Sequence, residues 1–358
     1  MLAGFIGLVL VALGVLRYGV LPYYDQKHNA VLVPGPYATS ATARAFHEAA
    51  FVADLHADPL LWGRNLRQRH TRGQMDLPRL RDGGVDLQVF SVVSQVPALL
   101  FIASLRSPAT WFSPRAQALA QANEFEHLAE NSALTIVLRR EDLSTNGIKG
   151  LLALEGIHAL EGEANALQEF HAAGFRMMGL VHFTDNEFAG STHGVEKHGL
   201  TELGRLLVPR MEALGITIDL AHASPPAFWD TLELATRPLV VSHGGVTGTC
   251  PGPRNLTDTQ LRGIAKNGGV VGIGYWKTAV CDASLQGIVS AIQYAISIAG
   301  IDHVGLGSDF DGHVTTPFDT TGLPMLTEAL LATGLSTEDV SKLLGGNVRR
   351  VLAANLPE

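Results

Sequence analysis

From residue 45 onward, short runs rich in Val, Ile and Leu alternate with longer helical stretches. The runs are apolar throughout rather than at every second position, which is typical of parallel strands buried on both faces of a sheet. The stretches between them have apolar residues at helical spacing and often end in glycine. Eight alternating strands and helices predict an α/β fold, a (β/α)8 barrel of the TIM type, over residues 45–358. The runs lie at residues 51–55, 86–93, 150–154, 177–181, 216–220, 239–241, 269–273 and 303–306.

The stretch between the second and third runs, residues 94–149, is longer than one helical crossover requires. We therefore expect an insertion at this point. Its apolar part, residues 97–112, could cover the substrate, contact a second copy in a homodimer or face a membrane. Ordinary packing against the barrel is the interpretation that we favour.

Composition excludes several classes of protein. The chain is 46% hydrophobic and 17% charged, which argues against a disordered chain, a coiled coil and a collagen-like repeat. Its net charge of -8 offers no basic surface for phosphates, so we expect no nucleic-acid partner. The 14 histidines are numerous beside 26 lysines and arginines, and their positions therefore matter most for function.

The segment before Pro22 is apolar or glycine apart from Arg17. A helix of about 20 residues can just cross the hydrocarbon core of a bilayer. No basic residue precedes the segment and no clear cleavage site follows it, so we expect a membrane anchor or uncleaved signal at residues 1–22 and a linker at 23–44. Arg17 and Lys27 weakly favour a cytoplasmic barrel by the positive-inside rule.

Acidic and imidazole side chains recur where the runs end. The active site of a (β/α)8 barrel lies at the carboxyl ends of its strands, so these side chains should converge. One histidine at a strand end is more often structural, but such residues follow six of the eight runs. Nitrogen and oxygen ligands of this mixture predict a site for Zn²⁺ or a similar divalent ion. The residues are His56, Asp58, Glu155, His182, His222, His243 and Asp309.

The number of ligands predicts two ions rather than one. His56, Asp58, His222 and His243 supply two ligands for each ion. Glu155 can bridge both ions beside a shared water. Two ions lower the pKa of that water and hold the oxyanion of a tetrahedral intermediate, as amide hydrolysis requires.

Other charged residues have candidate roles near this site. Asp309 could relay a proton or hold a substrate ammonium group, whereas Asp311 is as readily a structural partner. Arg254 could bind a substrate carboxylate through its guanidinium fork, although a loop arginine is usually a solvated surface charge. We expect the remaining histidines to be structural or to lie on the surface, among them His158, His171, His193, His198 and His303.

Nine sequence blocks resemble, in order, the membrane dipeptidase (renal dipeptidase) family of zinc peptidases over residues 50–353. The resemblance implies a barrel of the metal-dependent hydrolase type that hydrolyses dipeptides and tolerates a D-residue at the carboxyl-terminal position. D-L-H-A-D replaces the family's usual D-G-H-N-D, and H-G-G replaces the commoner residues after His243; neither change removes a ligand. The blocks are D-L-H-A-D, L-L-A-L-E-G-I-H, G-L-V-H-F-T-D-N, L-G-I-T-I-D-L-A-H-A-S, L-V-V-S-H, R-N-L-T-D, G-G-V-V-G-I, H-V-G-L-G-S-D-F-D-G and L-L-G-G-N-V-R-R-V-L.

The resemblance also implies individual roles. His56 and Asp58 would bind one zinc ion, and His222 and His243 the other. Glu155 would bridge the two ions and, with Asp309, supply the catalytic carboxylates.

The same resemblance implies the residues that contact a substrate. Arg254 would grip the substrate carboxylate, and Asp309 would lie near its amino end. His182 would contact the substrate, and Tyr275 corresponds to an aromatic contact position, with a possible shift of one residue.

Cys250 and Cys281 lie in regions where secreted relatives resemble this chain and carry a paired bridge. A disulfide and two free buried thiols are both open. A bridge would place the barrel outside the cytoplasm, and we favour this membrane-anchored, extracytoplasmic location. Two other functions stay open: a dinuclear barrel hydrolase of a lactone, phosphotriester or non-peptide amide, and a binding protein on an inactive barrel.

Overall fold

A computed structural model of the protein describes residues 2–104, 106–130, 132 and 134–358. Its strands form one parallel sheet in the order β2-β1-β9-β8-β7-β6-β5-β4-β3, and β2 also pairs with β4. That pairing closes eight strands into a ring, so the predicted (β/α)8 barrel is confirmed. The strands are β1 Ala53–Ala57, β2 Leu87–Val93, β3 Leu134–Ile136, β4 Ile148–Glu155, β5 Phe175–Gly179, β6 Thr217–Asp219, β7 Val240–Val241, β8 Val270–Ile273 and β9 Val304–Leu306.

Each predicted apolar run overlaps one strand of the ring. β3 was not predicted, because it has only three residues and pairs beside the start of β4. The expected insertion contains α5 Ala98–Ala103, while α6 Pro114–Ala129 is the crossover helix. α6 packs on the barrel through Phe125, whose ring centroid lies 5.0 Å from that of Phe90 in β2.

Helices surround the ring, and side-chain caps fix where many of them begin. Ser113, Thr201, Ser224, Thr257 and Ser284 each accept a hydrogen bond from the backbone N–H three residues further on. The helices from α3 onward, besides α5 and α6, are α3 Ala41–Ala49, α4 Leu77–Asp82, α7 Ala166–Ala172, α8 Glu202–Ala213, α9 Pro225–Leu234, α10 Asp258–Asn267, α11 Lys277–Val280, α12 Leu285–Ala299, α13 Leu323–Leu331, α14 Thr337–Ser341 and α15 Asn347–Asn355.

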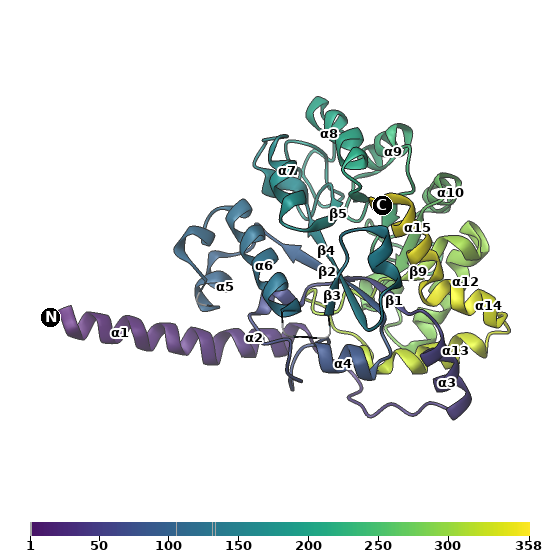
Figure 1. Cartoon of the computed structure of the whole chain (residues 1–358), viewed down its shortest axis with the longest axis horizontal. Coiled ribbons are helices and arrows are strands. Elements are labelled where there is room, and N and C mark those ends of the chain that lie inside the picture. The colour runs from purple at the N-terminus through teal and green to yellow at the C-terminus, as the bar shows by residue number, and fades with distance from the viewer. Residues whose placement is uncertain (1, 105, 131, 133) are drawn as a thin grey trace.

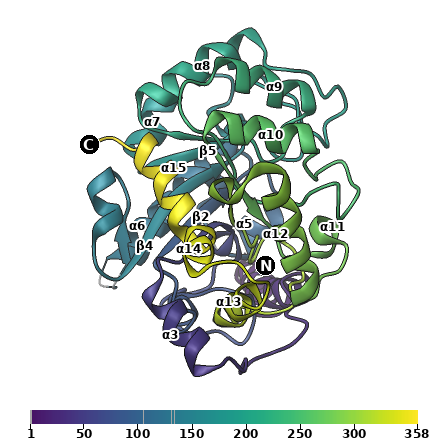
Figure 2. The same cartoon turned by 90° about the vertical axis from the view of Figure 1, so that its right-hand side faces the viewer.

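α15 closes the end of the barrel at which the strands begin. Its amides reach the barrel backbone there: Asn347 donates to the carbonyl of Val304, and Asn355 to that of Pro238. Val348 and Val351 pack on inward-facing strand residues. Figure 2 shows α15, in yellow, lying across the strands. The site must therefore open at the opposite end.

The amino-terminal segment is helical and projects from the barrel (Figure 1). α1 Leu2–Val15 continues through a π-helical turn at Leu16–Val20 into α2 Leu21–His28. Pro22 does not stop the helix as expected. The backbone stays helical through the π-helical turn, where Leu21 donates its N–H to the carbonyl of Leu16, and Pro22, which has no N–H to donate, follows directly in α2. Within the described ranges, no helix has both the length and the apolarity needed to cross a membrane.

Residues 23–44, expected to be a linker, are docked on the barrel. Asp25 is fully buried and accepts hydrogen bonds from Arg72 (2.9 Å) and Asn29 (2.9 Å). Arg64 lies between Asp25, at 3.4 Å, and Asp311 of the loop after β9. Leu32 extends the contact by donating its N–H to the carbonyl of Thr316. This network fixes α2 beside the barrel mouth.

Candidate metal centre

The residues expected to bind metal meet at the carboxyl ends of the strands. His56 lies in β1, Asp58 directly follows β1, and Glu155 is the last residue of β4. His222 and His243 lie in the loops after β6 and β7. All five side chains are at least 95% buried, although they come from four different strands.

Glu155 is at the centre of this group. Its Oε1 lies 3.0 Å from Nε2 of His222, 3.5 Å from Nε2 of His243 and 3.7 Å from Nε2 of His56. Nε2 of His56 lies 3.5 Å from Oδ1 of Asp58. The ligand atoms of His56, Asp58 and Glu155 form one compact group, and those of Glu155, His222 and His243 form a second. The two groups share Glu155.

Buried atoms without hydrogen bonds mark the place where a cation fits. Among the described residues, neither ring nitrogen of His56 has a hydrogen-bond partner, and Oδ1 of Asp58 has none either. Leaving a buried polar atom unpaired costs about 1–3 kcal/mol, so these atoms call for another ligand. Imidazole nitrogens and carboxylate oxygens suit Zn²⁺ and related ions. The donor set therefore fits a metal.

The neutral state of His222 and His243 agrees with this fit. Burial lowers the pKa of His222 and His243 well below the ordinary value of histidine, with further lowering by nearby positive charge. Both rings are thus neutral, which is the form that binds metal ions. Burial also opposes a charge on His56, but the carboxylates of Asp58 and Glu155 outweigh burial and raise its pKa to about 10. The negative charge gathered here needs a positive partner.

The buried acidic residues are likewise destabilised in their charged form. Burial raises the pKa of Glu155 well above its ordinary value, and the Asp58 carboxylate raises it further. Burial likewise raises the pKa of Asp309, whose Oδ1 lies 3.8 Å from Nε2 of His56. A divalent ion among these groups would stabilise the ionised carboxylates.

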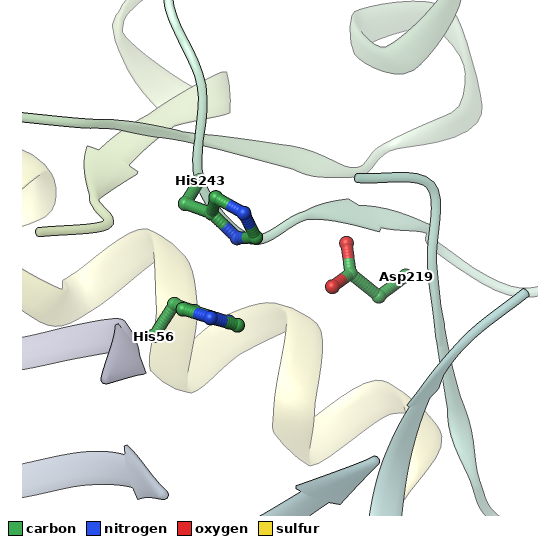
Figure 3. Close-up of side chains that lie close together, drawn as sticks. All are labelled: His56, Asp219 and His243. Atoms are coloured by element: carbon green, nitrogen blue, oxygen red, sulfur yellow. The ribbon is translucent and has the colours of Figure 1, made fainter. Parts of the chain in front are cut away.

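Asp219, the last residue of β6, is a functional residue that sequence reasoning missed. Its carboxylate lies near His56 and His243, as Figure 3 shows. Its Oδ1 accepts the N–H groups of Ala221 (2.9 Å) and Ser242 (2.8 Å), and its Oδ2 accepts the Ser242 hydroxyl (2.5 Å). The Ser242 oxygen lies 2.9 Å from Nδ1 of His243, so His243 presents Nε2 to the centre. Asp219 therefore positions a ligand rather than adding one.

Asp54 in β1 makes the equivalent contacts to the end of β9. It accepts the N–H of Ser308 at 2.8 Å and its hydroxyl at 2.5 Å. Ser308 immediately precedes Asp309, as Ser242 precedes His243. This repeated pairing, a strand aspartate with the serine before a site residue, is the signal that could have identified both aspartates.

The backbone is strained where two of these side chains enter the site. His222 and Asp309 have φ of 64° and 60°, in the left-handed region. A non-glycine residue there costs about 1–2 kcal/mol. Glycine would relieve that strain but would also remove the functional side chain. The strain is therefore a cost of placing these two side chains in the site.

A cavity of about 1500 Å³ opens over the centre. Its lining includes the predicted residues His182, Arg254 and Asp309. His182 places Nε2 3.6 Å from Oε2 of Glu155, and a terminal nitrogen of Arg254 lies 3.1 Å from Nε2 of His222. Arg254 is thus half-buried at the cavity and is not a free surface charge.

Other predicted positions lie elsewhere. Tyr275 is fully buried against Phe310 and Phe318 and is not among the described residues that line the cavity; its neighbour Trp276 lines it instead. His193, which we expected to be structural, also lines the cavity. Asp311 is structural, since it pairs with Arg64.

Cys250 and Cys281 form a disulfide. It joins the loop after β7 to the segment after β8, and both cysteines lie at the cavity wall. The bridge therefore ties together two loops of the barrel mouth, on the same side as Arg254.

A parallel barrel with buried imidazoles and carboxylates at its strand ends defines the class of metal-dependent barrel hydrolases. A family model described as membrane dipeptidase (peptidase family M19) matches residues 40–356. The chain belongs to this family, and its enzyme class is that of the metallo-dipeptidases.

Known relatives agree with this assignment. The chain is 32% identical to dipeptidase aclJ of Aspergillus oryzae, over 84% of this chain and 77% of that protein. It is 27% identical to a metallopeptidase of Rhodobacter sphaeroides liganded with a phosphinate mimic of the dipeptide L-Ala-D-Ala; the TM-score is 0.75, over 86% of this chain and 99% of that one. Dipeptidase AC is 28% identical, with a TM-score of 0.76 and the same coverage.

Proposed function

We propose that the protein is a dinuclear zinc dipeptidase that hydrolyses the peptide bond of free dipeptides. The observation that carries the proposal is the pair of ligand groups that share Glu155. His56 and Asp58 would hold one ion, His222 and His243 the other. Two ions in these positions would supply an activated water and polarise the peptide carbonyl.

The side chains around the centre would fix both ends of the substrate. Arg254 would bind the carboxylate through its guanidinium fork, and Asp309 would bind the ammonium group or accept a proton. Burial lowers the pKa of His182 well below the ordinary value, so its neutral ring would donate a hydrogen bond to the substrate. Fixing both charged ends rejects longer peptides by geometry.

We further propose that a D-residue is accepted at the carboxyl-terminal position. The related Rhodobacter sphaeroides enzyme is liganded with a mimic of L-Ala-D-Ala, which supports this proposal. The cavity, at about 1500 Å³, exceeds the roughly 300–1000 Å³ usual for small-molecule sites and leaves room for either configuration.

Metal analysis combined with dipeptide hydrolysis tests the proposal. We expect two zinc ions for each purified chain, activity on L-Ala-L-Ala and L-Ala-D-Ala, loss of activity in chelator and recovery on adding Zn²⁺. Full activity in protein shown to be metal-free would overturn it. If two ions are bound but no dipeptide is hydrolysed, the dipeptidase reaction is refuted and the dinuclear metal site is not.

Arg254→Ala tests whether the enzyme binds the free carboxylate of its substrate. Loss of a buried charge partner costs about 2–5 kcal/mol, so kcat/KM for dipeptides should fall at least 30-fold. Arg262→Ala, an exposed arginine on α10, is the matched control and should change kcat/KM less than two-fold. Unchanged activity in Arg254→Ala would favour a substrate without a free carboxylate, such as a lactone, a phosphotriester or a non-peptide amide.

We also propose that the barrel is exported and held at a membrane by residues 1–22. The Cys250–Cys281 disulfide supports export, because such bonds persist in oxidising compartments. Fractionation of cells that express the full chain, with alkylation of free thiols before lysis, tests both parts. Recovery of the protein in a high-salt wash of the membranes would contradict the membrane anchor. Alkylation of both cysteines would contradict the disulfide and, with it, the support for export. Homodimerisation remains a prediction, which sedimentation of the purified chain would check.

A further inference from the structure

The cavity is lined in part by residues outside the region that matches the family. That region begins at residue 40, yet Val20, Leu21 and Tyr24 line the same cavity as Glu155 and Asp309. We infer that this amino-terminal segment completes an apolar subsite for the side chain of the substrate's first residue, and that the enzyme selects dipeptides with a large apolar residue there. The inference rests on the proposed dipeptidase function and on the roles given to Arg254 and Asp309.

The wall of this subsite is a continuous apolar cluster. Leu21 packs with Leu61 and Trp62 of the turn Pro59–Trp62, and with Phe101 of α5. Leu100, also of α5, packs on the same cluster and lines the cavity. The apolar part of the insertion after β2 is thus covered by the amino-terminal segment, and the two together face the cavity.

Polar contacts hold the segment in this position. The Tyr24 hydroxyl lies 3.2 Å from Nε2 of His313, and the Tyr24 ring centroid lies 6.3 Å from that of Trp62. Trp62 donates its indole N–H to the carbonyl of Asp311 at 2.6 Å. Because buried Asp25 also anchors α2 through Arg64, the wall is fixed in the folded protein.

The positions of the charged groups along the cavity assign this subsite to the first residue of the dipeptide. Asp58 directly precedes the turn that carries Leu61 and Trp62, and Asp309 directly precedes the loop that reaches His313. Tyr24 of α2 lies against Trp62 and His313, so the chain segments that follow both carboxylates meet α2. Arg254 instead lies in the loop after β7, which is tied to the segment after β8 by the Cys250–Cys281 disulfide and by the hydrogen bond from Asn255 to the carbonyl of Thr278. A dipeptide with its carboxylate on Arg254 and its ammonium near Asp309 directs its first side chain toward Leu21, Tyr24 and Leu100.

A substrate series measures this selectivity on the full-length zinc-loaded enzyme. We expect kcat/KM to rise at least ten-fold from Gly-Ala to Leu-Ala and Phe-Ala, because the larger side chains remove more apolar surface from water. The reversed series, Ala-Gly to Ala-Phe, should show a smaller rise. Equal rises in the two series would overturn the assignment to the first residue.

Two adjacent tyrosines of α2 provide a matched pair of variants. Tyr24 lines the cavity, whereas Tyr23 is 65% exposed and does not belong to the described lining. Tyr24→Ala should lower the ratio of kcat/KM for Phe-Ala to that for Gly-Ala at least three-fold, and Tyr23→Ala should leave it unchanged. Leu100→Ala should act in the same direction as Tyr24→Ala, because Leu100 belongs to the same apolar wall.

The outcomes separate this inference from the function on which it rests. If no dipeptide is cleaved by the zinc-loaded enzyme, the proposed function fails. If Gly-Ala is cleaved but Tyr24→Ala and Leu100→Ala keep the parental ratio while unfolding at the parental temperature, the subsite is refuted. A variant with a lowered unfolding temperature is replaced by Tyr24→Leu, which keeps the apolar wall and should retain most of the preference.

Discussion

Ser242 lies between a buried carboxylate and a ring nitrogen of His243. Its hydroxyl hydrogen is donated to Asp219, so its oxygen can accept the Nδ1–H of His243. This arrangement selects the ring form in which Nε2 is free to bind metal. No ligand count would identify the serine, because it touches no metal position itself.

Removing this contact should weaken metal binding. Ser242→Ala leaves all five proposed ligands in place but frees His243 to rotate and to change its protonated nitrogen. We expect zinc affinity to fall about 10–100-fold, as measured by competition with a chromophoric chelator. Ser297→Ala, an exposed serine of α12 that bonds only its own helix, should keep the parental affinity. Equal affinities for the two variants would contradict the positioning role.

His158 makes stability depend on pH. Burial lowers its pKa to about 4, and its Nε2 lies 2.9 Å from the Ser94 hydroxyl. Its ring is neutral in both folded and unfolded chains at pH 7. Below about pH 6.5 this histidine is protonated in the unfolded chain but stays neutral in the folded protein. The free energy of unfolding therefore falls as the pH is lowered toward 4.

Urea unfolding of the metal-free protein measures this effect. Between pH 7 and pH 4.5 we expect the parental chain to lose about 2.5 kcal/mol more than His158→Gln, because only the parental chain carries this histidine. The surface variant His127→Gln should behave like the parental chain. Identical pH profiles for all three proteins would show that His158 is not buried in its neutral form.

At the scale of elements, the strand ends were the most predictable part of the site. His56, Glu155 and His243 could be placed because buried parallel strands leave long apolar runs that stop at a polar residue. Asp219 could not, although it ends β6, because its role depends on a contact with Ser242, which follows the next strand. The wall formed by α2 could not be predicted either, since it depends on contacts such as Asp25 with Arg64, which no local pattern records.

The end of β8 shows how one residue decides a site. Tyr275 and Trp276 are neighbours whose side chains point to opposite sides, so Tyr275 is in the core and Trp276 faces the cavity. Tyr275→Phe should keep kcat/KM within two-fold. Its buried hydroxyl has no hydrogen-bond partner among the described residues, so the free energy of unfolding should stay equal or rise by about 1–2 kcal/mol.

Steady-state kinetics and urea unfolding check the two parts. Trp276→Ala is the comparison, and it should lower kcat/KM because it removes a cavity wall. A large kinetic loss in Tyr275→Phe would restore the substrate-contacting role that the sequence suggested for this tyrosine.

At the scale of the whole molecule, buried charges hold the amino-terminal segment against the barrel. Asp25 of α2, Arg64 and Asp311 form a continuous chain of ion pairs that ends two residues from Asp309. Breaking one partner of a buried pair leaves the other charge uncompensated. The position of α2 is therefore coupled to the stability of the mouth.

Asp25→Ala should lower the free energy of unfolding by about 3 kcal/mol, because Arg64 stays buried without one of its partners. Asp82→Ala breaks the solvent-exposed pair of Asp82 with Arg69 and should cost about 0–1 kcal/mol. Hydrogen exchange should also rise selectively at residues 21–33 in Asp25→Ala. Unchanged exchange in that segment would show that the ion pairs do not hold α2.

α15 closes the end of the barrel opposite the metal centre, and this closed end is a suitable place to attach a label. The chain leaves the barrel there, where the carbonyl of Pro357 accepts the N–H of Arg140, far along the strands from the metal centre. A fluorophore or a solid support attached after Glu358 would leave the cavity unobstructed. The same attachment near Tyr24 would stand beside the entrance, so carboxyl-terminal attachment is the better design for single-molecule or immobilised assays.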